Sequence, residues 1–98
     1  MGSPNLIKTP TVTKTTLAAT TVTLVQATNT ERTLIGLHNE SGATIWFAFA
    51  ESAPANTDTM EPLPDATGIY FEANSGLSRA NLYAYSVAGG VVKTSEAL

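Results

Sequence analysis

Residues 33–50 read TLIGLHNESGATIWFAFA, and this stretch constrains the fold more than any other part of the chain. Two apolar runs flank the polar cluster of residues 39–42, which ends in glycine. Period-2 alternation in both runs predicts two β-strands, each with one face towards a core. A short polar cluster ending in glycine between such strands is typical of a hairpin turn. We therefore predict a central β-hairpin whose core face carries Ile35, Leu37, Ile45, Phe47 and Phe49.

Shorter strand-like segments surround the central hairpin. Their positions are residues 20–26, 68–73, 81–87 and 91–94. The glycine pair before the last segment predicts a second hairpin, because glycine adopts positive φ without steric cost. No stretch has the 3.6-residue apolar period of an amphipathic helix. The sequence therefore predicts an all-β fold, namely a small antiparallel β-sandwich or barrel of six to seven strands.

The first residues differ in composition from the rest, since threonine dominates and Pro4 and Pro10 disfavour regular pairing. We assign residues 1–19 to an extended N-terminal arm and residues 20–98 to one β-sandwich domain. The arm could lie along a neighbouring subunit and add main-chain hydrogen bonds, or it could be a frayed terminus. Its candidate partner-binding residues are Leu6, Ile7 and Val12.

Charged residues make up only 13% of the chain, whereas soluble domains average about 25%. Small neutral polar side chains take their place, and such a surface is easily desolvated against another protein. We therefore expect a homo-oligomer or a subunit of a larger protein assembly.

The net charge is −3 and the five basic residues are scattered. Nucleic-acid binding requires a basic stripe, so we expect no nucleic-acid partner.

The chain has no cysteine, so disulfide bonds cannot stabilise it. Its longest strongly apolar run, Ile45–Ala50, is far shorter than the ~20 residues that cross a bilayer. No apolar segment near the first residue has the character of a signal peptide. We therefore expect a soluble protein made in the cytoplasm, with no membrane partner.

Residues 51–68 form a long proline-bearing segment, and segments of this kind are often functional. The spacing of its carboxylates matches no calcium loop, so we expect a solvated acidic loop and no metal site at Asp58, Glu61 and Asp65. Met60 and Leu63 are expected to plug this loop onto the core or onto a partner. We count both among the candidate partner-binding residues.

His38 is the only histidine, and no nucleophile motif accompanies it. It lies beside the predicted turn, where we expect it to cap a backbone group or to face solvent. Arg32 is expected at the surface, at the rim of the hairpin beside Glu31 or Glu40. The sequence shows no catalytic constellation, phosphate loop or dinucleotide fingerprint, so we predict that the protein is not an enzyme and holds no cofactor.

Four aromatic side chains admit two interpretations, and they are Trp46, Tyr70, Tyr83 and Tyr85. They could form an exposed platform for a sugar, or they could fill the core and the subunit interfaces. The second interpretation is favoured, because aromatic residues are what fills a small β core. Trp46 lies opposite the core face of its strand, so we expect that strand to be partly covered on both sides.

Residues from about 20 to 97 resemble small virion-associated proteins of tailed bacteriophages. In that group an arginine-led strand ends in asparagine and a small polar turn, and an aromatic strand follows. A Tyr-Ala strand then leads through glycines to a valine-rich end. The matching stretches are ERTLIGLHNESGATIWFAF and LYAYSVAGGVVKTSE, and the residues that carry the resemblance are Arg32, Asn39, Ser41, Gly42, Trp46, Phe47, Tyr83, Ala84, Gly89 and Gly90. The acidic segment 58–65 departs from the shorter glycine-rich turn that is frequent in such chains.

The resemblance implies a structural protein of the virion, foremost a capsid decoration (cement) protein. Such a protein stabilises the shell by bridging subunits of the major capsid protein, and it often forms trimers. The resemblance thus also implies a homotrimer that resides in the virion. Two other classes stay open, because the acidic loop leaves the partner unspecified. One is a tail, neck or fibre-attachment component, and the other is a carbohydrate-binding module.

Overall fold

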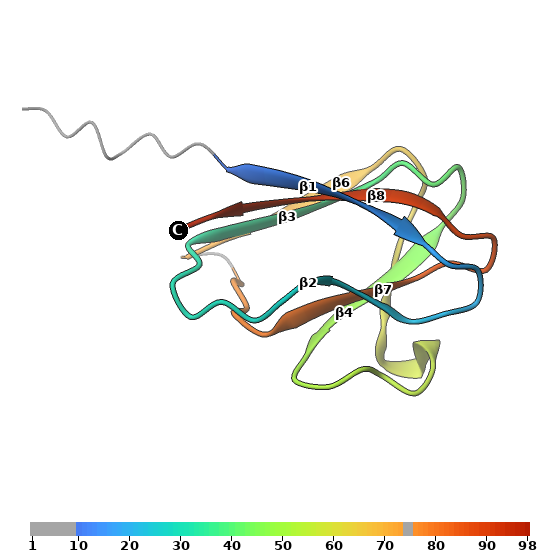
Figure 1. Cartoon of the computed structure of the whole chain (residues 1–98), viewed down its shortest axis with the longest axis horizontal. Helices are drawn as coiled ribbons and strands as arrows, with labels where there is room; N and C mark the ends of the chain where they lie inside the picture. The colour runs from blue at the N-terminus through green and yellow to red at the C-terminus, as the bar shows by residue number, and fades with distance from the viewer. Residues whose placement is uncertain (1–9, 74–75) are drawn as a thin grey trace, which may run out of the picture.

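The structure is a computed structural model that describes residues 10–73 and 76–98 of the chain (Figure 1). In these residues eight strands form two facing sheets, and one short 3₁₀ turn, η2 (Thr57–Thr59), precedes the fifth strand. The strands are β1 (Thr11–Leu17), β2 (Thr23–Gln26), β3 (Leu34–Asn39), β4 (Ile45–Ala50), β5 (Glu61–Leu63), β6 (Gly68–Glu72), β7 (Asn81–Tyr85) and β8 (Gly90–Ala97).

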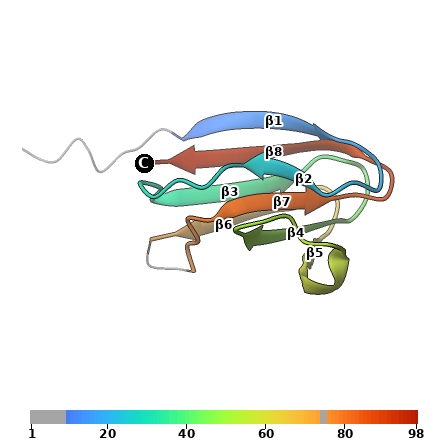
Figure 2. The same ribbon diagram turned by 60° about the horizontal axis from the view of Figure 1, so that its bottom comes forward.

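Sheet A has the strand order β1-β8-β3-β6 and sheet B has the order β2-β7-β4-β5. The strand pairs within both sheets are antiparallel. Except for β4 and β5, strands that follow each other along the chain lie in opposite sheets, as Figures 1 and 2 show. This is the topology of an eight-stranded jelly roll. The predicted all-β sandwich is confirmed, with eight strands in place of six or seven.

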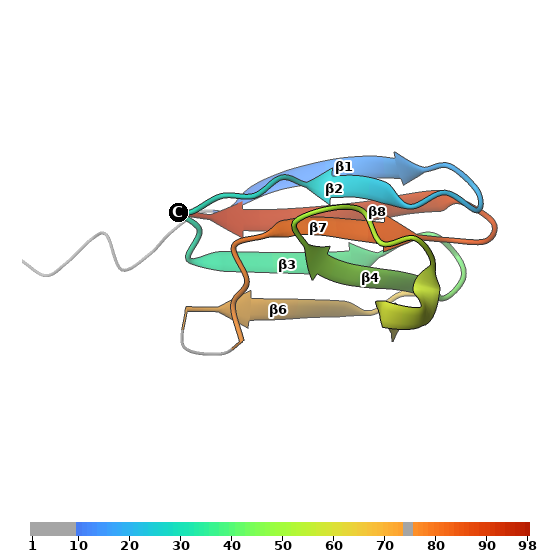
Figure 3. The same cartoon turned by 90° about the horizontal axis from the view of Figure 1, so that it is seen from below.

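Both hairpins predicted from the sequence are wrong. β3 pairs with β6 and β8 in sheet A, whereas β4 pairs with β5 and β7 in sheet B. β7 and β8 are likewise in opposite sheets. A strand has two edges, and β6 and β8 occupy both edges of β3, so β4 cannot pair with it. The polar cluster after β3 and the glycine-bearing segment after β7 are therefore arches that carry the chain from one sheet to the other. Figure 3 shows sheet B lying over sheet A.

The predicted alternation of faces is correct even though the pairing is not. Ile35 and Leu37 of β3 and Ile45 and Phe47 of β4 are buried between the sheets. Each fully buried apolar side chain stabilises the fold by roughly 1.5–3 kcal/mol. The core also contains Leu17, Val25, Leu63, Leu82, Ala84 and Val92.

The sandwich begins at Thr11 rather than at residue 20. Thr11–Leu17, part of the predicted arm, forms β1 and pairs with β8 from Thr11 opposite Glu96 to Leu17 opposite Gly90. Threonine favours strands, and the buried Leu17 anchors the strand to the core. Residues 1–9 lie outside the described residues, so the arm remains a prediction for them.

Asn39 holds the arch between β3 and β4. Its side chain is fully buried, and Nδ2 donates to the carbonyls of Ala43 at 2.7 Å and Leu63 at 2.9 Å. Its Oδ1 accepts from the backbone N–H of Ser41 at 2.9 Å. A buried polar side chain needs such partners. The side-chain amide of Asn39 therefore links the arch to the end of β5, at the point where the chain passes from sheet A to sheet B.

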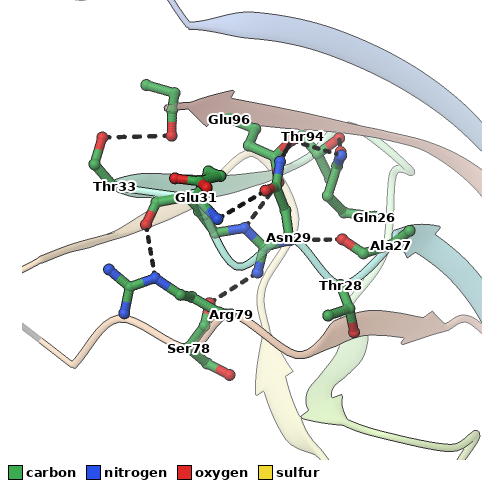
Figure 4. A network of polar contacts seen from close by, with 12 residues as sticks. Gln26, Ala27, Thr28, Asn29, Glu31, Thr33, Ser78, Arg79, Thr94 and Glu96 are labelled. Carbon is green, nitrogen blue, oxygen red and sulfur yellow. Dashed lines mark hydrogen bonds and ion pairs between the residues drawn. The ribbon is translucent and has the colours of Figure 1, made fainter.

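Arg32 holds the other end of β3, and the prediction that it lies at the surface is wrong because its side chain is fully buried. Nε donates to Glu96 Oε2 at 2.8 Å, and Nη2 donates to the carbonyl of Ala27 at 2.8 Å. Nη1 donates to the carbonyls of Ser78 at 2.8 Å and Ala80 at 3.0 Å. These bonds join β8 of sheet A to the segments that flank β2 and β7 of sheet B. Figure 4 shows the network with its partners Glu96, Ala27 and Ser78 labelled.

The carboxylate of Glu96 extends the network into the core. Its Oε1 accepts from Gln26 Nε2 at 3.2 Å and from Asn29 Nδ2 at 3.4 Å. Gln26 in turn accepts from the hydroxyl of buried Thr94 at 2.9 Å. The ion pair is therefore surrounded by further hydrogen bonds, which a buried charge requires.

Replacing Arg32 with alanine should lower the free energy of unfolding by about 3–5 kcal/mol, because the largely buried Glu96 carboxylate would lose its cation. Chemical denaturation followed by the fluorescence of Trp46 measures the change. The control Lys14→Ala removes an exposed cation from β1 and should change stability by less than about 0.5 kcal/mol. Equal effects of the two variants would contradict a structural role for the Arg32–Glu96 pair.

Candidate interaction surfaces

The sheets expose four edge strands in the described part of the chain, and they differ in their suitability for strand addition. β5 has three residues including Pro62, and β2 has four residues with an irregular register between Leu24 and Gln26. Both features blunt an edge. β6 has five residues. β1 has seven, most of them exposed, in unbroken register with β8. β1 is therefore the edge best suited to pair with another chain.

Val12 is the predicted partner-binding residue that the structure leaves on this edge. It is 60% exposed. Leu6 and Ile7 lie outside the described residues, so their predicted role is unchanged.

Met60 and Leu63 are buried within their own chain, so of their two predicted roles the structure shows the one in which they hold the loop onto the core. Their exposed fractions are 7% and 4%. Leu63 lies opposite Ile45 in the β4–β5 pair and belongs to the core cluster. The acidic loop is thus fastened to the core of its own chain, which leaves little of either side chain for a partner.

Three of the four predicted aromatic residues share the outer face of sheet B. Leu24 and Ala48 flank Tyr83, while Trp46 lies opposite Tyr85. We call these five residues the sheet B face. None of them is charged, and Leu24 is 47% exposed. The rings of Trp46 and Tyr85 meet edge to face, with centroids 6.3 Å apart.

Tyr70, the fourth aromatic residue, lies in sheet A and is 63% exposed. Its ring covers Gly36, where the added Cβ of any other residue would overlap it. The four aromatic residues therefore do not form one platform.

The outer face of sheet A carries charge. Lys93 lies between Lys14 and His38 in register, and its Nζ is 3.2 Å from Glu40 Oε2. His38 is half exposed as predicted, with Nδ1 3.5 Å from the same carboxylate oxygen. The two faces of the sandwich thus offer different chemistry, one ionic and one neutral and aromatic.

The acidic loop is organised by hydrogen bonds within the protein. Asp65 accepts from the backbone N–H of Gly42 at 2.9 Å, and the backbone N–H of Asp58 donates to Asn56. No group of three or more histidine or acidic residues that could hold a metal is found in residues 10–73 and 76–98. In the same residues the structure contains no helix long and apolar enough to span a bilayer.

A groove of about 480 Å³ continues from the sheet B face at the Tyr85 end. It lies between the β1–β2 loop and the β4–β5 loop. Three threonines, one asparagine, one tyrosine and three apolar residues line it: Thr20, Thr21, Val22, Pro54, Ala55, Asn56, Thr57 and Tyr85. Sequence reasoning missed this groove, because the two loops are far apart in sequence and neither carries a motif.

The fold and these surfaces define the class of the protein, which is a small jelly-roll domain with one long regular edge strand, β1, and one neutral outer face. Comparison with protein-family models found no match, and neither did comparison with curated protein sequences. Among solved structures, the chain is similar to a protein of Bacillus endospore appendages, described as a novel family of disulfide-linked pili. The TM-score is 0.48 with 12% identity, over 94% of this chain and 91% of that chain.

Substitution of Leu63 by alanine should destabilise the protein by about 2–5 kcal/mol, because it leaves a cavity in the core. Thermal or chemical unfolding checks this. Val12→Ala is the matched control, and its effect should stay within about 0.5 kcal/mol since Val12 is exposed. If Leu63→Ala left stability unchanged, the side chain would not be part of the core.

Proposed function

We propose that this jelly roll is a structural protein that adheres to other protein subunits through the open edge of sheet A. The observation that carries the proposal is β1, a regular seven-residue edge strand that is mostly exposed. A partner strand that pairs with β1 gains main-chain hydrogen bonds along the whole edge. Alternating side-chain contacts, including Val12, then supply specificity.

We further propose that the partner is the major capsid protein of a tailed phage and that the protein is a capsid decoration protein of the virion. The resemblance of residues 20–97 to virion-associated proteins supports this narrower assignment. The low content of charged residues supports it too, because neutral surfaces suit burial against protein.

The stabilising mechanism in this proposal is bridging. Each decoration subunit contacts more than one coat subunit, so separating two capsomers also breaks the contacts of the bridge. Modest contacts add up when the geometry allows them to form together. A homotrimer would present three open edges and so multiply the contacts.

The proposal predicts that purified protein is retained by capsid shells assembled without it and raises the temperature at which they disrupt. Thr13→Lys should weaken retention by at least about tenfold, because Thr13 lies on the inner side of the edge opposite buried Thr94, and inward charges block strand addition. Co-sedimentation and a thermal disruption assay measure these effects. Ala88→Lys adds the same charge in an exposed loop and should leave retention unchanged.

Failure of shells to retain the wild-type chain would overturn the capsid assignment, and retention by isolated tails instead would favour a tail or neck component. Retention that is equally sensitive to Thr13→Lys and Ala88→Lys would overturn the role of β1. Solution mass tests the trimer separately, since a monomer at working concentration would refute it.

A further inference from the structure

We propose that the groove between the β1–β2 and β4–β5 loops, together with the sheet B face beside it, binds a neutral carbohydrate chain. This inference concerns a different surface from the β1 edge. The volume of the groove, about 480 Å³, lies in the range of small-ligand sites, roughly 300–1,000 Å³. The groove is open rather than enclosed, as a site for part of a longer chain must be.

The lining of the groove combines hydrogen-bonding groups with apolar surface. A sugar is complementary to such a lining, because it carries both hydroxyl groups and apolar C–H faces. Thr20 and Thr21 both donate their hydroxyl hydrogens to the carbonyl of Ala19, at 2.7 and 3.1 Å, so each oxygen keeps lone pairs for a ligand hydroxyl. Asn56 uses its Oδ1 to accept from Asp58, which leaves its amide hydrogens as donors. The Tyr85 ring supplies a flat surface on which the C–H face of a pyranose can stack.

The absence of charge in the lining selects the kind of ligand. None of the eight lining residues is charged, and neither is any residue of the sheet B face. An anionic or cationic ligand would lose hydration here without an ionic partner, which is unfavourable. A neutral sugar loses only hydroxyl hydration, and the threonines and Asn56 replace those hydrogen bonds. The surface therefore favours neutral over acidic carbohydrates.

Contacts within the protein fix the β1–β2 loop and the Tyr85 ring that line the site. Thr20 has φ of +53°, which is unfavourable for a β-branched residue, and its N–H donates to the carbonyl of buried Ser86 at 2.8 Å. Gly89 packs against the same loop, since a Cβ there would lie 2.8 Å from the carbonyl oxygen of Leu17. The Tyr85 ring packs edge to face against the ring of Trp46. A site whose residues are already held in place loses little conformational entropy when a ligand binds.

Trp46 is the only tryptophan and contacts Tyr85, so its fluorescence reports occupancy of the site. The full chain is titrated with neutral hexasaccharides of glucose, xylose, mannose and N-acetylglucosamine, and with galacturonic acid hexamer. We expect saturable binding of at least one neutral chain and binding of the acidic hexamer at least about tenfold weaker. Amide NMR shifts should concentrate at residues 20–22 and 55–57.

Tyr85→Ala should weaken binding at least about tenfold. Tyr70→Ala is the matched control, because Tyr70 is an exposed tyrosine in sheet A, and it should bind as the wild type does. Thr21→Val is a second, isosteric test that removes one exposed hydroxyl and should weaken binding several-fold. Thermal unfolding of each variant confirms that it is folded.

Three outcomes would overturn the inference: no binding of any hexasaccharide, equal loss on Tyr70→Ala and Tyr85→Ala, or binding that both Thr21→Val and Tyr85→Ala leave intact. The result is independent of the capsid proposal, because Tyr85→Ala leaves the β1 edge untouched. Loss of capsid retention on Tyr85→Ala, without sugar binding, would assign the sheet B face to protein contact and refute the carbohydrate site.

Discussion

The guanidinium of Arg32 is the contact on which the arrangement of the two sheets depends. A fully buried cation must have both a counterion and hydrogen-bond acceptors, and it finds them in Glu96 and in three backbone carbonyls. These partners come from β8, from the residue after β2 and from the segment before β7. The chain satisfies the charge only when these three segments meet, so one side chain specifies which ends of the strands converge.

Asn39 performs the equivalent task at the other end of β3, with a neutral amide in place of a charge. Together the two residues hold the arches at both ends of a central strand of sheet A. The surfaces that remain are then unlike each other: a long open edge at β1, a charged outer face on sheet A and a neutral aromatic face on sheet B. Adhesion to protein and binding of sugar can therefore use separate parts of a small domain.

The sequence predicted the strands well, and it predicted their pairing poorly. Period-2 alternation identifies β3 and β4 because the inward residues must be apolar in whichever sheet a strand lies. It cannot identify the neighbour of a strand, because a glycine-ended polar cluster serves a hairpin and an arch equally. For Met60 and Leu63 the sequence left two roles open, packing onto the core or onto a partner, because only the pairing of β5 with β4 buries this part of the loop.

Composition and local pattern by themselves determined an all-β domain, the core-facing residues of β3 and β4 and a surface poor in charge, since each follows from side chains a few residues apart. Only the tertiary structure decided the sheet to which each strand belongs, the burial of Arg32 and the existence of the groove beside Tyr85. The physical reason is distance along the chain. Arg32 meets a counterion 64 residues away, and the groove joins two loops that become neighbours only after both sheets have formed.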